Sequence, residues 1–353
     1  MRVLILGPAT PIVFRLFDAL KRRGVDVFLA SHGVIEDDRV FNLGRVESFL
    51  DYFKFYKINH LIKFLQPDIV HAHILNHYGF MSIFSSRPVV VALWGSEIML
   101  DPYEGKWLRR LILFLINKIS LKKATRIHTS GSHVALEAIK QCSSIKSRTE
   151  FYYWGFPIPE PSSDEYIKVA GDLDLEFDIG EKLIVFNRGL SSVYNPEGVA
   201  KIINKLISLG VDRRRLIVLK AFSSNNEVNA FKNKVEFSKI VFVDRLLTNS
   251  ELYTLYKKTS LHISIPLSDS LGGGVIEPAI LGSFPVLSAL PSYIEYAKKN
   301  TALVIHDVDK ELDFIVDFIV KEMWMNTSSS GLAHYNEDNV IDKILSTYQK
   351  ALG

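Results

Sequence analysis

Short runs of apolar residues alternate with segments of helical periodicity along the whole chain. Five runs in the first half are almost continuously apolar, which is typical of parallel strands buried on both faces. They are RVLILG (2–7), VDVFLAS (25–31), DIVHAH (68–73), VVVALWG (89–95) and TRIHTS (125–130). The segments FRLFDALKRRG, ending at Gly24, and FLDYFKFYKINHLIKFLQ, before Pro67, predict helices between them. This alternation predicts a doubly wound α/β domain.

The pattern breaks between residues 157 and 181, where PIPEPSSDE precedes an acidic run and predicts a linker. A second alternating series follows, with strands KLIVFNRG, RLIVLKAF, KIVFVDR, LHISIP and FPVLSAL and helices at 196–209, near 228–235 and along NSELYTLYKKT. We therefore expect two Rossmann-like, doubly wound domains, 1–160 and 161–335, facing each other across a cleft at the carboxyl ends of their strands. A last helix falls within 336–353, and its return to the first domain is left open.

Composition narrows the class of protein. A length of 353 residues exceeds the usual limit of about 250–300 for a single core, and 48% hydrophobic with 23% charged residues is ordinary for a globular chain. The single cysteine, Cys142, excludes an internal disulfide and fits a reducing compartment. The opening run VLILG is short for a signal peptide, and no segment is apolar enough to span a membrane. We expect a cytoplasmic protein, and a net charge of +3 gives no argument for a nucleic-acid partner.

The segment SDSLGGGVIEP (268–278) joins a predicted strand to a predicted helix through glycines. A helix start offers unpaired N–H groups and partial positive charge, and glycine lets an anion approach the backbone. Asp269 on the loop and Glu277 in the helix can hold sugar hydroxyls. The phosphate cradle itself is predicted at Gly272, Gly273 and Gly274. The alternative is a plain turn with solvated acids.

Two further loops at strand ends carry candidate ligand contacts. FNRGLSSVYNPE places Arg188 after a strand, where arginine can pair with a diphosphate and offset charge on a leaving group. A surface salt bridge is the alternative. The first loop, GPATP, is not GxGxxG, so dinucleotide binding is not supported. Gly7 can still let a ligand approach the backbone and Thr10 can supply a hydroxyl, although a plain turn fits equally well.

The first domain also presents polar residues at two strand ends. His71 and His73 share one face of a strand, but without a nearby acid or cysteine they are better suited to positioning a loop than to binding zinc. Glu97, in ALWGSE, is expected to point into the cleft, where it would orient an acceptor hydroxyl or act as a base. Capping the segment that follows is the alternative. The acceptor-side candidates are His71, His73, Trp94, Gly95 and Ser96.

The segment 106–123 predicts a helix with cations at both ends and an apolar middle. It has more apolar surface than packing against one sheet requires, and contact with an anionic bilayer would use both features. A buried helix whose lysines extend to solvent is the alternative.

With these motifs in place, the chain resembles the GT-B glycosyltransferases, specifically the large bacterial retaining family four. The likeness extends from Arg2 to about Tyr296. It rests on PDIVHAH, ALWGSE with its following DP, NRGLSSVYNPE, and the block from Asp269 to Glu277 followed by GSFPVLSALPSYIEY. The family carries two acidic residues at the spacing of Asp269 and Glu277.

The resemblance implies a role for each matching residue. Asp269 would contact the donor sugar, Glu277 the ribose hydroxyls, and Arg188 with the amides of the glycine turn the diphosphate. The chain departs from the family because its first acid is aspartate rather than glutamate. The lysine expected about six residues after Arg188 is also absent, and Tyr194 or Asn195 stands there. A third departure is that RLIVLKAFSS lacks the glycine pair often found after that strand, where Lys220 is a candidate to supply a charge.

Taken together, these expectations describe a glycosyltransferase that moves a sugar from a nucleoside-diphosphate donor to a glycan or lipid-linked acceptor. The expected reaction is retaining, independent of metal and free of any cofactor other than the nucleotide-sugar substrate, in bacterial surface polysaccharide synthesis. Its expected location is cytoplasmic, with contact to an anionic inner membrane face through 106–123. The alternatives are a nucleotide-sugar epimerase of similar fold and a catalytically degenerate partner subunit. The sugar, base, acceptor, linkage and oligomeric state are left open.

Overall fold

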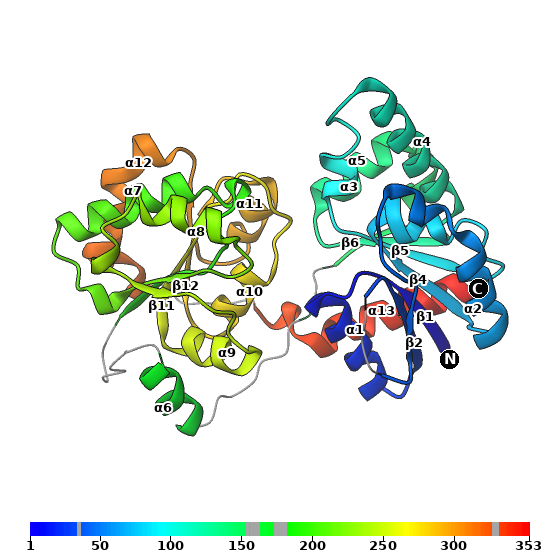
Figure 1. Ribbon diagram of the computed structural model, residues 1–353, viewed down its shortest axis with the longest axis horizontal. Coiled ribbons are helices and arrows are strands. Elements are labelled where there is room, and N and C mark those ends of the chain that lie inside the picture. The colour runs from blue at the N-terminus through cyan, green and yellow to red at the C-terminus, as the bar shows by residue number, and fades with distance from the viewer. Residues whose placement is uncertain (34–36, 153–154, 156–162, 173–181, 327–331) are drawn as a thin grey trace. The chain divides into compact units, whose positions relative to one another are not determined.

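The structure, a computed structural model, describes residues 1–33, 37–152, 155, 163–172, 182–326 and 332–353. The chain divides into two compact units, Met1–Gly155 with Glu337–Gly353, and Phe156–Asn336. Each unit contains one parallel sheet with helices on both faces (Figure 1). The prediction of two Rossmann-like α/β domains is confirmed. The predicted boundary at residue 160 lies outside the described residues.

The amino-terminal sheet has seven strands in the order β3-β2-β1-β4-β5-β6-β7. They are β1 (Arg2–Leu6), β2 (Asp26–Ser31), β3 (Val40–Asn42), β4 (Ile69–His73), β5 (Val89–Leu93), β6 (Arg126–Thr129) and β7 (Thr149–Phe151). The helices are α1 (Pro11–Arg22), α2 (Phe55–Leu65), α3 (Ser96–Met99), α4 (Trp107–Lys123), α5 (Ser132–Gln141) and α13 (Glu337–Leu352). In β1, Val3 and Ile5 pack into the core beside α1 and α13, whereas Leu4 and Leu6 pack into the core beside α2. The strand is apolar throughout because helices cover both faces.

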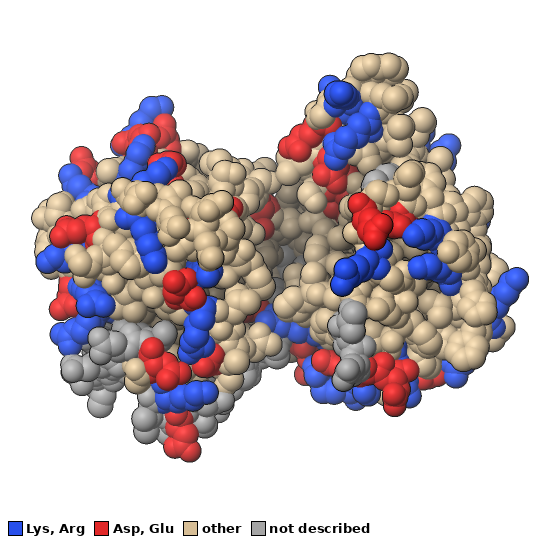
Figure 2. Space-filling view, in the orientation of Figure 1, with Lys and Arg blue, Asp and Glu red and all other residues tan. Residues whose placement is uncertain are grey.

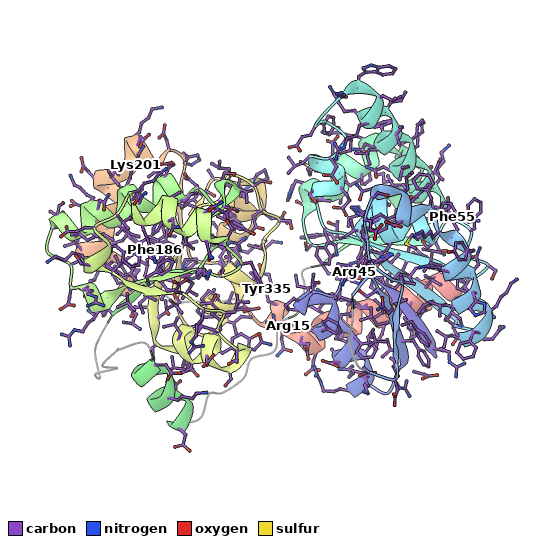
Figure 3. All side chains as sticks on the ribbon, in the orientation of Figure 1. Arg15, Arg45, Phe55, Phe186, Lys201 and Tyr335 are labelled. Carbon is purple, nitrogen blue, oxygen red and sulfur yellow. The ribbon has the colours of Figure 1, made fainter. Side chains whose placement is uncertain are left out.

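The carboxyl-terminal sheet has six strands in the order β10-β9-β8-β11-β12-β13. They are β8 (Leu183–Phe186), β9 (Leu216–Leu219), β10 (Val241–Val243), β11 (Thr259–Ser264), β12 (Phe284–Ser288) and β13 (Leu303–Ile305). The helices are α6 (Ser163–Asp172), α7 (Pro196–Ser208), α8 (Asn225–Lys232), α9 (Asn249–Lys258), α10 (Gly273–Ile280), α11 (Pro291–Ala297) and α12 (Val308–Val320). Figure 3 places the Phe186 side chain in the middle of this unit's core, where it is buried. The loops after β8 and β11, which carry candidate site residues, start from this core.

The last helix, α13, packs on the amino-terminal sheet. Ile344 and Tyr348 join the core cluster that contains the inner face of α1. Arg22 and Arg23, at the end of α1, form ion pairs with Glu337, Asp338 and Asp342. The chain therefore returns to its first sheet after completing the second, and α1 and α13 lie side by side (Figure 1).

Capping residues shift two of the predicted helices. The helix expected over 49–66 is interrupted at Lys54, because a capping box of Ser48 and Asp51 starts a separate short turn, η1 (Phe49–Phe53). The helix expected near 228–235 lies at Asn225–Lys232, because a second capping box, of Ser224 and Glu227, starts it earlier. The strands β3, β7 and β13 were not predicted, since three residues show too little alternation to recognise.

The predicted linker contains a helix. Within 157–181 the described residues form α6, and Asp172 at its end pairs with Arg245 of the carboxyl-terminal unit. The rest of that stretch, and residues 327–331 of the predicted loop near the end of the chain, lie outside the described residues. None of the described helices has the length and hydropathy needed to span a bilayer.

Candidate functional site

The loop from β11 to α10 places the start of a helix beside a carboxylate. Gly272 is the N-cap residue of α10, and no side chain caps this helix among the described residues. Leu271 adopts a left-handed backbone (φ 66°), which turns the chain into the helix. The amide of Gly272 points to Asp269, at 3.4 Å from Oδ2. The predicted order of strand, glycine turn and helix is therefore present, with first-turn N–H groups that no side chain caps.

Arg188 lies against this loop. It lies two residues after the end of β8, and its Nη2 is 3.2 Å from Asp269 Oδ2. Burial alone would lower the pKa of Arg188, but the Asp269 carboxylate beside it raises that pKa, so the guanidinium stays charged. A Cβ on Gly274 would come within 2.6 Å of Arg188 Nη1. An alanine at residue 274 would therefore force the Arg188 guanidinium to move from its contact with the start of α10.

Neighbouring residues, not recognised in the sequence, hold this arrangement together. Asn187 donates hydrogen bonds from Nδ2 to the Gly274 carbonyl (2.6 Å) and the Tyr256 hydroxyl (3.1 Å). Tyr293 of α11 donates its hydroxyl hydrogen to Asp269 Oδ2 at 2.6 Å. Asn187 follows β8, Asp269 follows β11 and Tyr293 lies on the helix after β12, so the sheet brings together residues from three strand ends.

The other predicted donor-side residues differ in their surroundings. Tyr194 lies under Arg188, with the guanidinium carbon 4.7 Å from the ring centroid. Asn195 instead caps α7, since its Oδ1 accepts the Gly198 amide hydrogen at 3.1 Å. Glu277 is buried on α10, and its charge adds to the desolvation that raises the pKa of Tyr256. Lys220, the candidate charge after β9, pairs with Asp244 at 3.2 Å.

In the amino-terminal unit, Gly7 and Thr10 lie on the loop between β1 and α1. A Cβ on Gly7 would approach Val13 Cγ2 to 3.2 Å and His73 Cβ to 3.4 Å, so the loop packs tightly there. Thr10 is the N-cap residue of α1, but its hydroxyl makes no cap hydrogen bond. Its Oγ1 is buried and has no hydrogen-bond partner among the described residues. A ligand hydroxyl or phosphate would satisfy it.

The expectation that Glu97 points into the cleft is wrong. Its side chain is fully buried, and its carboxylate oxygens accept the amide hydrogens of Trp94 (2.7 Å) and Gly95 (2.9 Å). Burial raises the pKa of Glu97. Gly95 has φ 121°, a conformation that favours glycine, and the turn folds the carboxylate inward, whereas Ser96 is exposed. Glu97 therefore has the capping role that was its alternative interpretation.

The histidines also lie in the interior rather than at a surface. His71 Nε2 is 2.9 Å from His128 Nε2, and His71 Nδ1 is 2.7 Å from the Tyr348 hydroxyl of α13. His73 accepts from Trp94 Nε1 at 3.2 Å. His71 and His73 do share a strand face, as predicted, but α13 covers that face. His71 is therefore a core residue, and its prediction as an acceptor-side residue is wrong. His73 instead supports Trp94 at the strand end.

One family model matches the first part of the chain, and solved structures share the fold of the whole chain. Residues 2–130 match the family described as "Glycosyl transferase 4-like". Curated proteins include no match. Similar solved structures include sucrose-phosphate synthase from Thermosynechococcus elongatus (TM-score 0.79, 13% identity, 99% of this chain and 98% of that one). The structure of HepE of Anabaena with UDP-glucose has a TM-score of 0.69 and 12% identity, and the match covers 99% of this chain and 98% of that one. The catalytic domain of Arabidopsis thaliana starch synthase IV with ADP and acarbose has a TM-score of 0.70 and 10% identity, and the match covers 99% of each chain.

The fold is that of the GT-B glycosyltransferases. At identities this low the likeness establishes the GT-B fold and not the substrate. Two of these GT-B structures hold different nucleotides, UDP-glucose and ADP.

Proposed function

We propose that this protein is a glycosyltransferase that transfers a sugar from a nucleoside-diphosphate donor to a glycan or lipid-linked saccharide. The observation that carries the proposal is the Arg188–Asp269 pair beside the uncapped start of α10. A charged guanidinium and a helix start bind a diphosphate, and a carboxylate next to them binds a sugar hydroxyl. The GT-B relatives that hold UDP-glucose or ADP support this choice of ligand.

In the proposed reaction, the bond between the sugar and the diphosphate breaks and negative charge grows on the departing phosphate. Arg188 and the first amides of α10 stabilise that charge, which is the contribution expected of preorganised donors. Asp269 and Glu277 hold the sugar and the ribose. We infer a reaction that needs no metal ion from this cationic site, and retention of the anomeric configuration from the resemblance to family four.

We further propose that the enzyme works at the inner face of a bacterial membrane, on acceptors of surface polysaccharide synthesis. The support is α4, which exposes seven large apolar side chains, and Trp107 among them is 73% exposed. They are Trp107, Leu108, Leu111, Ile112, Phe114, Leu115 and Ile119. The cations Lys118, Lys122 and Lys123 are exposed on the same helix. Figure 2 shows uncharged surface beside Lys and Arg side chains around this part of the unit. Apolar residues flanked by cations suit an anionic interface.

The test is a panel of UDP-, ADP-, GDP- and dTDP-sugars incubated with wild-type protein and saccharide acceptors. Release of nucleoside diphosphate together with a new glycosidic bond would support the proposal, and the anomeric configuration by NMR would test retention. Interconversion of the donor without an acceptor would point to an epimerase. Binding without turnover would point to a catalytically degenerate subunit.

A further inference from the structure

The two oxygens of the Asp269 carboxylate have different surroundings. Oδ2 is contacted by the Tyr293 hydroxyl at 2.6 Å, Arg188 Nη2 at 3.2 Å and the Gly272 amide at 3.4 Å. Oδ1 has no hydrogen bond to any residue that the structure describes, and the Asp269 side chain keeps 15% exposure. All the protein donors thus converge on one oxygen and leave the other to accept from a ligand.

The α11 helix supplies the shortest of these contacts. Tyr293 is fully buried, and its hydroxyl also lies 3.2 Å from Ser264 Oγ, at the end of β11. Its neighbour Ser292 donates to the Asp269 carbonyl at 3.0 Å. Burial and the Asp269 charge raise the pKa of Tyr293, so its hydroxyl keeps its hydrogen. Two adjacent α11 residues therefore hold the backbone and the side chain of Asp269.

The geometry of Arg188 agrees with this division. Its Nη2 faces Asp269, whereas its Nη1 lies against Gly274 at the start of α10. One nitrogen is paired within the protein, and the other is next to the amides proposed to bind the diphosphate. Without Tyr293, Arg188 would be the main donor left on Asp269, and the carboxylate would be free to rotate towards it.

We propose that Tyr293 is a positioning residue for glycosyl transfer, acting through Asp269. Its hydroxyl holds Oδ2 so that Oδ1 faces the donor sugar, and it keeps Asp269 from closing fully on Arg188. This inference rests on the proposed function, since it assigns a task to a residue of the same site. The Tyr293 hydroxyl also fixes the direction of the Asp269 carboxylate, whose side chain is shorter than the glutamate expected from the family resemblance.

The test compares Tyr293→Phe with Tyr296→Phe, which removes a buried hydroxyl from the same helix away from Asp269. We expect kcat to fall roughly 10- to 100-fold in Tyr293→Phe, the factor that loss of a hydrogen bond to a charged group gives. Tyr296→Phe should stay near wild type. In an Asp269→Ala background, Tyr293→Phe should have no further effect on kcat, since its partner is gone. Wild-type turnover in Tyr293→Phe, or an equal loss in both backgrounds, would overturn the inference.

A binding measurement separates this inference from the proposed function. If the wild-type protein turns over no donor, calorimetry with UDP-glucose, UDP, ADP-glucose and ADP replaces the rate. Tyr293→Phe should weaken binding of the nucleotide sugar but not of the free nucleotide, because Asp269 faces the sugar. Equal affinities in wild type and variant would reject the positioning role. Failure of these four ligands, and of the GDP- and dTDP-sugars with their free nucleotides, to bind would reject both proposals.

Discussion

The guanidinium of Arg188 stacks on the ring of Tyr194, with 4.7 Å between its central carbon and the ring centroid. Tyr194 stands near the place where the family resemblance leads one to expect a lysine. The chain therefore has an aromatic support for one cation where a second cation was expected. This support leaves Arg188 as the principal charge beside α10.

Removing that charge should affect the rate more than binding. We expect Arg188→Ala to lower kcat roughly 10²- to 10³-fold, as for loss of one preorganised charge stabiliser. Single-turnover kinetics with saturating donor would measure it. Arg214→Ala, an exposed arginine of the same unit, is the control. Unchanged chemistry in Arg188→Ala would mean that the Arg188–Asp269 pair is purely structural.

Tyr194 should act through its ring rather than its hydroxyl. A cation–π contact contributes about 0.5–2 kcal/mol, so Tyr194→Ala should weaken donor binding roughly 2- to 30-fold. Tyr194→Phe keeps the ring and should bind like wild type. Calorimetric titration of the donor distinguishes them, and equal losses in both variants would assign the effect to the hydroxyl instead.

A methyl group at residue 274 should disturb the site more than the fold. It would lie 2.6 Å from Arg188 Nη1, so the guanidinium has to move. We expect Gly274→Ala to reduce turnover on the order of 10²-fold, the effect of a displacement of about 1 Å at a reacting centre. Gly171→Ala on α6, where a Cβ meets nothing within 4 Å, is the matched control. Thermal denaturation of both variants would show whether any loss comes from unfolding.

The buried histidines should make the amino-terminal unit sensitive to acid. Burial lowers the pKa of His73 and of His128 to about 3, and it lowers that of His71 as well. Between the unfolded value, near 6.5, and these folded values, the unfolded chain binds more protons, so stability falls as pH falls. We expect the free energy of unfolding to decrease from pH 7 to pH 5 by up to about 1.4 kcal/mol per pH unit for each histidine. Urea denaturation would measure the slope.

A His128 variant tests whether the buried histidines cause the dependence of unfolding free energy on pH. His128→Phe keeps a ring to stack on Tyr152, whose ring lies parallel to that of His128, and removes one titrating group. Its slope should be smaller than that of wild type. Phe64→Leu, a non-titrating change at an exposed side chain of the same unit, should leave the slope unchanged. A slope that is the same in His128→Phe would contradict the assignment.

The apolar face of α4 should bind anionic bilayers. Leu111→Ser with Leu115→Ser removes apolar contact, and Lys118→Gln with Lys122→Gln removes attraction of about 1 kcal/mol per cation. Both pairs should reduce sedimentation with phosphatidylglycerol vesicles, and added salt should weaken binding. Phe222→Ser, at a side chain 82% exposed in the other unit, is the control. Failure of the wild-type protein to bind vesicles at low salt would rule out the membrane contact.

Much of the fold could be predicted because its signals are local. Continuous apolar runs marked strands such as β1, β4 and β11, since each run records burial of that strand on both faces. Glycines and capping residues marked the turns, including the glycine start of α10. Three-residue strands such as β13 are too short to show such a run of apolar residues, and their pairing depends on neighbours elsewhere in the chain.

The candidate site was predictable to the extent that each contact involved a residue at a strand end. Arg188 and Asp269 were identified in this way, and the structure brings them to 3.2 Å. Tyr293 and Asn187 were missed because a tyrosine or asparagine next to a strand has many ordinary roles. Glu97 was misplaced, since the direction of its side chain depends on the turn at Gly95, with φ 121°.

The sequence by itself determined two doubly wound domains, a glycine-rich helix start and the acids on either side of it. These features depend on the periodicity of buried residues and on turn-forming residues, which can be seen within short segments of the chain. Only the tertiary structure decided which side chains meet. Parallel order placed the end of β8 beside the end of β11, so Arg188 reached Asp269, and α11 brought Tyr293 to the same carboxylate. The return of α13 likewise buried His71. Such contacts join residues far apart in the chain, and no local pattern of polarity records them.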